Sequence, residues 1–75
     1  MQRYKNRSSD SGVVAYETGE QSIVIEFRGG DRYLYTAAST GAANIVIMQG
    51  LARAGVGLCT FISKVIRKRY ARKLA

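Results

Sequence analysis

The sequence has no histidine, no proline and no tryptophan, and it has one cysteine among 75 residues. Without histidine, the usual general base and a common metal ligand are missing. The single cysteine, Cys59, excludes a disulfide within the chain and is typical of a reducing compartment. It lies at the edge of an apolar stripe, which favours a small buried residue over a reactive thiolate. We therefore expect no catalytic residue, no metal site, no cofactor and no enzymatic activity.

Long apolar runs are missing too. Residues 1–11 are polar, so we expect a flexible N-terminal arm there and no signal peptide. The longest apolar-rich segment, residues 37–54, contains Asn44, Gln49 and Arg53 and is too short and too polar to span a bilayer. Residues 12–75 suit one small domain. We expect a cytoplasmic protein with no membrane partner.

Acidic residues are missing from the second half of the chain. Residues 1–37 contain five basic and five acidic side chains, whereas residues 38–75 contain seven basic side chains and no acidic one. The second half therefore accounts for the whole net charge of +7. A surplus of cations in one part of a chain indicates a polyanionic partner.

The first half contains short runs of β-branched and aromatic residues, which are typical of strands. They predict a three-stranded antiparallel meander with strands at about residues 12–17, 21–28 and 32–36. These strands are separated by residues that favour turns, because glycine recurs between them.

The register of the meander follows from its large side chains. A two-residue turn at Thr18 and Gly19, and a loop at residues 29–31 that places Phe27 opposite Tyr33, keep these side chains on one face. The predicted core face consists of Val14, Tyr16, Ile23, Ile25, Phe27, Tyr33 and Tyr35. The opposite face carries a small apolar patch of Val13, Ala15, Val24 and Leu34, which is either ordinary surface or a dimer contact.

Two helices are expected after the strands, at about residues 40–54 and 58–70. Ser39 or Thr40 can cap the first helix, and Gly55 can end it. The expected apolar stripes are Ile47, Met48, Leu51 and Ala52 in the first helix and Leu58, Phe61, Ile62, Val65 and Ile66 in the second. The predicted fold class is α+β, a three-stranded antiparallel β-meander followed by two helices packed on one face of the sheet.

The tyrosines of the meander have two interpretations. If the helices cover their face, Tyr16, Tyr33 and Tyr35 belong to the core, which is the favoured interpretation. If the helices cover the other face, the same rings form an exposed platform for stacking bases. Asn44 could read a ligand, but a satisfied polar group at a helix start is favoured.

The strand pattern "Y…IxIxF…G…YxY" and the terminal pattern "FIxxxIRxRY" together resemble the KTSC family, which is named for a domain at the C-terminus of some lysyl-tRNA synthetases. Members of that family also occur as small bacterial and phage proteins. The resemblance covers about residues 12–74. It falls on Tyr16, Ile23, Ile25, Phe27, Tyr33 and Tyr35 in the strands and on Phe61, Ile66, Arg67 and Tyr70 in the last helix. The sequence departs from the family at "AASTGAANI", where many members have proline and a valine-rich helix start. The synthetase connection implies contact with RNA.

The C-terminal basic cluster is the main functional signal. Its cations have no acidic neighbour in the second half of the chain, and arginine, whose planar fork suits phosphate oxygens, predominates. The candidate nucleic-acid-binding residues are Arg53, Lys64, Arg67, Lys68, Arg69, Tyr70, Arg72 and Lys73. A solubilising face is the second interpretation of this cluster. Binding to anionic lipid is the third, because the apolar stripe that such binding would use is already needed to cover the sheet.

Two functions compete on these observations. The first is a small basic nucleic-acid-binding accessory module that prefers RNA to DNA and binds phosphates with little reading of bases. The second is a protein-interaction module, a homodimer that forms through the edge or the outer face of the sheet.

Overall fold

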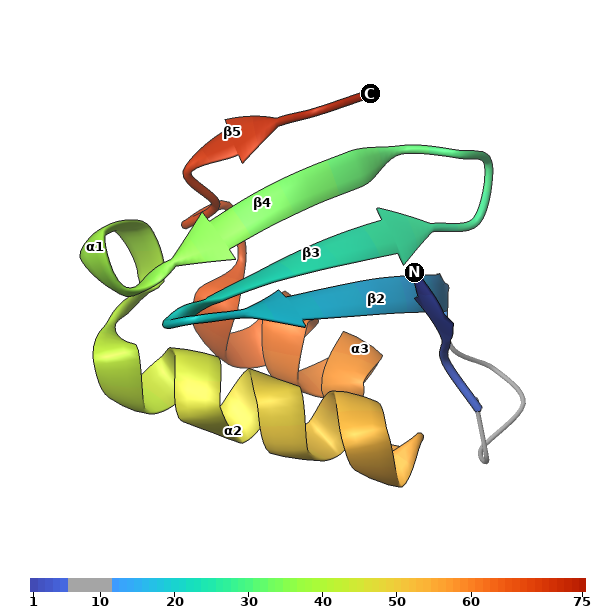
Figure 1. The fold of residues 1–75 in the computed structure, drawn as a ribbon, viewed down its shortest axis with the longest axis horizontal. Coiled ribbons are helices and arrows are strands. Elements are labelled where there is room, and N and C mark those ends of the chain that lie inside the picture. The colour runs from blue at the N-terminus through green and yellow to red at the C-terminus, as the bar shows by residue number, and fades with distance from the viewer. Residues whose placement is uncertain (6–11) are drawn as a thin grey trace.

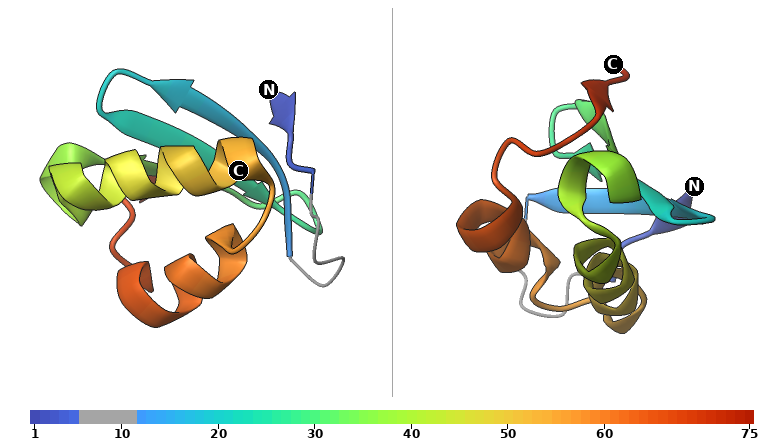
Figure 2. Two further views of the ribbon diagram at one scale, coloured as in Figure 1. Left: turned by 90° about the horizontal axis from the view of Figure 1, so that it is seen from below. Right: turned by 90° about the vertical axis from the view of Figure 1, so that its left-hand side faces the viewer.

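The computed structural model describes residues 1–5 and 12–75 and has an α+β fold, as predicted. An antiparallel sheet with strand order β1-β2-β3-β4-β5 is covered on one face by helices (Figures 1 and 2). Its strands are β1 (Gln2–Arg3), β2 (Val13–Gly19), β3 (Ser22–Phe27), β4 (Arg32–Thr36) and β5 (Arg72–Lys73). Its helices are α1 (Ala37–Thr40), α2 (Ala42–Ala54), α3 (Leu58–Phe61) and the π-helical turn η1 (Ile62–Ile66). The predicted arrangement of three strands and two helices is therefore too simple.

The first turn lies two residues later than predicted. Gly19 pairs with Ser22, so the turn consists of Glu20 and Gln21, and Gln21 has a left-handed φ of 57°. The amide of Gln49 in α2 donates hydrogen bonds to the carbonyls of Gly19 and Ser22, at 3.0 and 2.8 Å. A helix thus holds both strand ends at this turn, which local sequence preference could not reveal.

A β-bulge changes which valine is in the core. Val13 pairs with Phe27, but Ala15 pairs with Glu26, so β2 has one extra residue between these pairs. The extra residue reverses the alternation of faces. Val13 is consequently 1% exposed, while Val14, which was predicted for the core face, is only partly buried.

The pairing of β3 with β4 keeps the predicted faces but not the predicted register. Ile25 pairs with Tyr33 and Ile23 pairs with Tyr35, a shift of two residues. An even shift leaves every side chain on its own face. This explains why the core face was largely correct although the partners were wrong.

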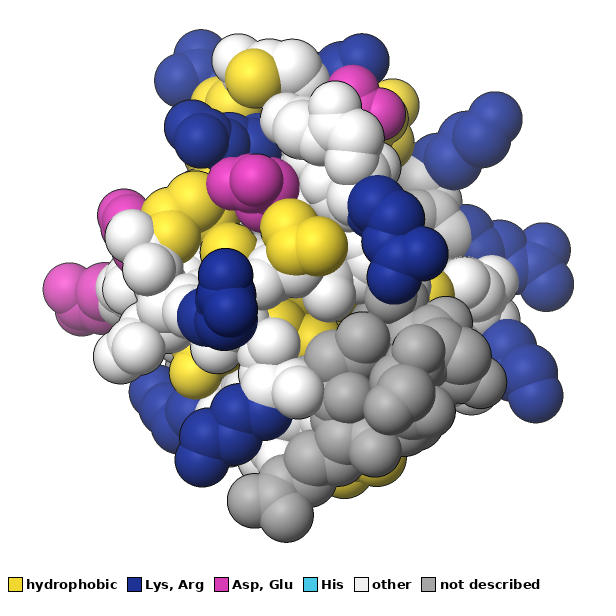
Figure 3. Space-filling view, turned by 90° about the vertical axis from the view of Figure 1, so that its right-hand side faces the viewer, with side chains coloured by type: hydrophobic (Ala, Val, Ile, Leu, Met, Phe, Trp, Pro, Cys, Tyr) yellow, Lys and Arg dark blue, Asp and Glu magenta, His cyan; other side chains and the backbone are white. Residues whose placement is uncertain are grey.

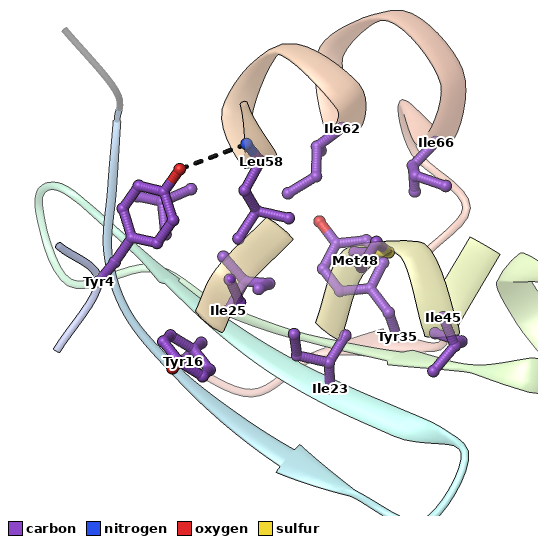
Figure 4. Close-up of a cluster of buried hydrophobic side chains, with 12 residues drawn as sticks. Tyr4, Tyr16, Ile23, Ile25, Tyr35, Ile45, Met48, Leu58, Ile62 and Ile66 are labelled. Carbon is purple, nitrogen blue, oxygen red and sulfur yellow. Dashed lines mark hydrogen bonds between the residues drawn. The ribbon is translucent and has the colours of Figure 1, made fainter. Parts of the chain in front are cut away.

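The helices cover the tyrosine face of the sheet, so the favoured interpretation of these rings is right for the buried Tyr16 and Tyr35. Figure 4 shows side chains of α2, α3 and η1 pointing toward those of the strands. The buried residues of this core are Tyr4, Val13, Tyr16, Ile23, Ile25, Tyr35, Ile45, Met48, Ala52, Leu58, Ile62 and Ile66. Within the described ranges, no helix has the length and apolar content needed to cross a membrane.

Two predicted stripe residues lie at the surface. Ile47 and Val65 are both 45% exposed, and Ile45 is buried in α2 instead. In η1 the backbone N–H of Arg67 donates to the carbonyl of Ile62, five residues earlier. Such a π-helical turn is wider than an α-helical turn. Residues four apart therefore stay in line on the core face, and Val65 turns outward.

The first helix begins differently from the prediction. Thr36 and Ser39 form a reciprocal capping box on the short α1, and Gly41, with φ 101°, separates α1 from α2. The Asn44 amide donates to the carbonyl of Thr40 at 2.9 Å, which confirms its interpretation as a satisfied polar group. The segment that departs from the KTSC pattern is thus a helical turn followed by a break.

The start of the chain belongs to the domain rather than to an arm. β1 pairs with β2, and Tyr4 is 3% exposed. The Tyr4 hydroxyl accepts a hydrogen bond from the backbone N–H of Leu58 at 3.3 Å, in the first turn of α3 (Figure 4). The predicted flexible arm is therefore wrong for residues 1–5, and its remainder, residues 6–11, lies outside the described residues.

The last helix ends four residues earlier than predicted. Arg67 has φ 54° and ψ −116°, which stops η1 at Ile66. The chain then returns along the sheet, where the N–H of Ala71 donates to Leu34 at 2.6 Å and the N–H of Leu74 donates to Arg32 at 2.7 Å. Figure 1 shows the resulting strand, β5, beyond β4. The backbone after Arg67 therefore pairs with the edge of β4 instead of continuing the helix that the sequence pattern predicted.

Candidate nucleic-acid interface

The C-terminal basic cluster lies on a turn and an edge strand, not on one face of a helix. Arg67, Lys68 and Arg69 follow η1 directly, and all three are exposed. The hydroxyl of the buried Thr40 donates to the carbonyl of Arg69 at 2.7 Å. This hydrogen bond fixes the turn against the junction of α1 and α2, so three consecutive cations are presented from an anchored backbone.

The two cations of β5 lie on opposite faces of the sheet. Arg72 pairs with Leu34 and therefore lies on the face away from the helices, whereas Lys73 pairs with Tyr33 on the helix-covered face. The Lys73 Nζ lies 3.4 Å from Asp31 Oδ1 and 5.9 Å from the centre of the Tyr33 ring. The fold thus brings an acid of the first half to one of the predicted cations.

Arg53 lies far from the turn. It is in the last turn of α2, whereas Thr40, which contacts Arg69, lies two residues before the start of that helix. The 13 residues of α2 span about 20 Å at 1.5 Å per residue. Lys64 is exposed on η1. The structure therefore groups Arg67, Lys68 and Arg69 and leaves Arg53 apart.

A pocket lies beside this turn, with a volume of about 340 Å³. We call it the aromatic pocket. Its wall consists of Phe27, Asp31, Tyr33, Tyr35, Ile62, Arg67, Lys68 and Tyr70. The last three were predicted as site residues. The others were predicted as core or loop residues, and only the return of the chain along β4 brings the two groups together.

The rings in the wall form a continuous contact. The Tyr33 and Tyr70 ring centres lie 4.6 Å apart with a tilt of 49°, and Phe27 meets Tyr33 edge to face at 5.7 Å. Tyr35 meets Tyr70 edge to face at 6.3 Å. These distances are typical of favourable aromatic pairs. Tyr70, predicted as a nucleic-acid-binding residue, joins the core to the pocket.

Charge in the aromatic pocket is unevenly paired. Asp31 binds Lys73, whereas Arg67 and Lys68 have no acidic partner among residues 1–5 and 12–75. Burial, followed by the neighbouring Tyr33 and Tyr70, raises the pKa of Tyr35 to about 12. This hydroxyl is therefore protonated at neutral pH. The pocket thus combines aromatic walls with two unpaired cations.

Cations also lie on other surfaces of the molecule. A hollow of about 630 Å³ lies near the start of the chain, and its wall includes Arg3, Tyr4 and Lys5. Its third cation, Arg32, binds Glu26 at 3.1 Å. On the face drawn in Figure 3, basic and acidic side chains lie among one another with apolar groups between them. Both hollows thus have cations without an acidic partner among the described residues, and the aromatic pocket differs from the other in its group of rings in mutual contact.

The surfaces proposed for a dimer are changed by the fold. β1 and β5 occupy the outer sides of β2 and β4, each with two residues. Val24 and Leu34 are only partly buried on the outer face. The large apolar side chain with the greatest exposure among the described residues is Val46 of α2, at 68%, and its neighbour Ile47 is also exposed. The exposed apolar surface thus extends to α2.

Comparison of the chain with models of protein families, with curated proteins and with solved structures finds no match.

Proposed function

We propose that the chain is a small basic nucleic-acid-binding accessory module of the cytoplasm, which binds the phosphates of RNA through Arg67, Lys68 and Arg69. The observation that carries this proposal is the anchored turn after η1, where three exposed consecutive cations have no acidic partner among the described residues. Phosphate contacts of this kind provide most of the affinity in weak, sequence-tolerant binding.

The proposed interface includes residues that follow the turn but does not include Arg53. Tyr70 and Arg72 extend it, and Lys73 contributes less because Asp31 already binds it. We leave Arg53 outside the interface because the length of α2 separates it from Arg69. The resemblance to the KTSC family, which we propose as the family of this chain, favours RNA over DNA.

The test is the salt dependence of binding. Single-stranded RNA and DNA of equal length are titrated at several salt concentrations against the natural chain and the double variant Arg67→Ala/Lys68→Ala. We expect the variant to bind every sequence more weakly, with a slope against the logarithm of salt concentration smaller by about 1.4, because each phosphate contact contributes about 0.7 for single strands.

The matched control is Lys5→Ala/Arg53→Ala, which removes the same charge at the other end of the molecule. Lys5 and Gly55 are adjacent in space, so this pair of cations flanks the end of α2. We expect the control to keep the slope of the natural chain. The proposal fails if the natural chain binds neither nucleic acid at low salt, or if both double variants lower the slope equally.

A second candidate function is self-association through an apolar surface. Exposure of Val46 and Ile47 on α2, together with the partly buried Val24 and Leu34, favours it. Sedimentation over a range of concentrations distinguishes this candidate, because a monomer at every concentration excludes it.

A further inference from the structure

We propose that the aromatic pocket takes one unstacked base of single-stranded RNA while Arg67 and Lys68 bind the adjacent phosphate. This inference rests on the proposed function and adds to it, because phosphate contacts alone would not distinguish single strands from duplexes. It predicts a subsite for a nucleotide unit within a module that is otherwise indifferent to sequence.

The shape and walls of the pocket are suited to a single base. A volume of about 340 Å³ is at the lower end of the range of about 300–1,000 Å³ for small-molecule sites. Its walls include the rings of Phe27, Tyr33 and Tyr70. Bases stack on aromatic side chains whatever their sequence, since every base has a π face. A paired base inside a duplex would have to leave its stack before it could enter.

The charges favour a phosphate at the pocket wall formed by Arg67 and Lys68. Both side chains are exposed, line the pocket and lack an acidic partner among the described residues. Asp31, which also lines the pocket, can accept hydrogen bonds from the amino groups of a base but repels phosphate. The aromatic part of the wall therefore favours the base of a nucleotide, and the part formed by Arg67 and Lys68 favours its phosphate.

The backbone of Arg67 gives independent support. Its φ of 54° with ψ −116° is strained for any residue with a Cβ, and glycine would adopt it more easily. The Arg67 side chain has no hydrogen bond or ion pair within residues 1–5 and 12–75 that would offset the strain. Strained residues of this kind are concentrated at ligand sites. An arginine held in this conformation beside a pocket is therefore consistent with contact to a ligand.

The experiment compares phosphate-bearing probes with and without accessible bases. A labelled single-stranded ribo-oligonucleotide is displaced from the natural chain by unlabelled single strand, by duplex RNA, by linear polyphosphate and by a nucleoside monophosphate. We expect the single strand to compete at least tenfold better than duplex or polyphosphate at equal phosphate concentration. We expect the monophosphate to compete only at far higher concentration.

Two variants of Tyr70 separate the ring from its hydroxyl. Tyr70→Leu keeps apolar bulk but removes the stacking surface, so we expect single-strand affinity to fall about fivefold or more, while polyphosphate affinity changes less than twofold. Tyr70→Phe should bind as the natural chain does. Circular dichroism tests whether each variant is folded. If Tyr70→Leu is unfolded, the displacement experiment with the natural chain alone tests the base subsite.

The outcomes distinguish the two proposals. If the natural chain binds no probe, the proposed function fails and this inference fails with it. If single strand, duplex and polyphosphate compete equally, phosphate binding stands and the base subsite is wrong. If the nucleoside monophosphate competes as well as the oligonucleotide, the pocket is a free-nucleotide site and the inference of an RNA subsite is overturned.

Discussion

The two ends of the chain are attached to the same sheet in different ways. β1 and β5 are both two-residue edge strands, but the chain after β1 buries Tyr4, which is 3% exposed and hydrogen-bonded to Leu58. The segment around β5 is held by backbone hydrogen bonds to β4, and residues 71–75 are all exposed. An edge strand held by its backbone leaves its side chains available for a ligand, whereas one that buries a side chain contributes mainly to stability.

The largest expected effect is at the first end of the chain, where Tyr4 is buried. Tyr4→Ala removes a large buried ring and should lower the free energy of unfolding by about 3–4 kcal/mol. Binding of RNA by the folded variant should be unchanged, because Tyr4 lies outside the proposed interface. Chemical denaturation followed by circular dichroism measures the loss.

The matched control at this end is Tyr4→Phe. It keeps the ring and removes the hydrogen bond to Leu58, so the loss should be about 1 kcal/mol. A loss below 1 kcal/mol for Tyr4→Ala would contradict the stabilising role of this buried ring.

A smaller effect is expected at Tyr35, where the core meets the aromatic pocket. Burial raises the pKa of Tyr35 to about 12 from its ordinary value of 10. Between these pH values the unfolded chain releases the phenolic proton and the folded chain keeps it. Stability is therefore fully present below pH 10 and is lost as the pH rises toward 12, by up to about 2–3 kcal/mol.

This pH dependence is measured by denaturation at a series of pH values from 9 to 12. Tyr35→Phe has no ionisable group at this position, so its stability should fall less over that range. Parallel curves for the natural chain and Tyr35→Phe would contradict the prediction.

The smallest effect is expected at Arg67, near the second end of the chain. Arg67→Gly relieves the strained φ of 54° and should raise the free energy of unfolding by about 1 kcal/mol, while it weakens RNA binding. Arg67→Ala keeps the strain and should weaken binding by a similar factor without the gain in stability. Thermal denaturation and RNA titration of both variants test this, and a Gly variant less stable than the Ala variant would disprove the strain.

Much of the fold could be predicted from local patterns. Alternation of large side chains placed Ile23, Ile25 and Tyr35 on one face of a sheet, and the structure buries all three. The face of a strand depends only on alternation, so it survived a register shift of two residues. The bulge at Val13 could not be foreseen, because one extra residue leaves the composition of β2 unchanged.

The candidate site was predictable in part. The surplus of cations pointed to the C-terminal segment, and Arg67, Lys68 and Arg69 do lie together there. The aromatic pocket was not predictable, because it depends on where the helix stops. Tyr33 and Asp31, far from Tyr70 in sequence, line the same pocket only after the chain reverses at Arg67.

Local sequence was enough to predict the α+β class, the antiparallel strands and the location of the basic surplus, because these depend on periodicity and charge along the chain. The edge strands, the buried N-terminal tyrosine and the aromatic pocket depend on tertiary contacts. The tertiary structure converted both ends into edge strands because β2 and β4 offered unpaired backbone groups, which need hydrogen-bond partners. In doing so it buried Tyr4, paired Lys73 with Asp31 and brought the unpaired cations against the aromatic rings.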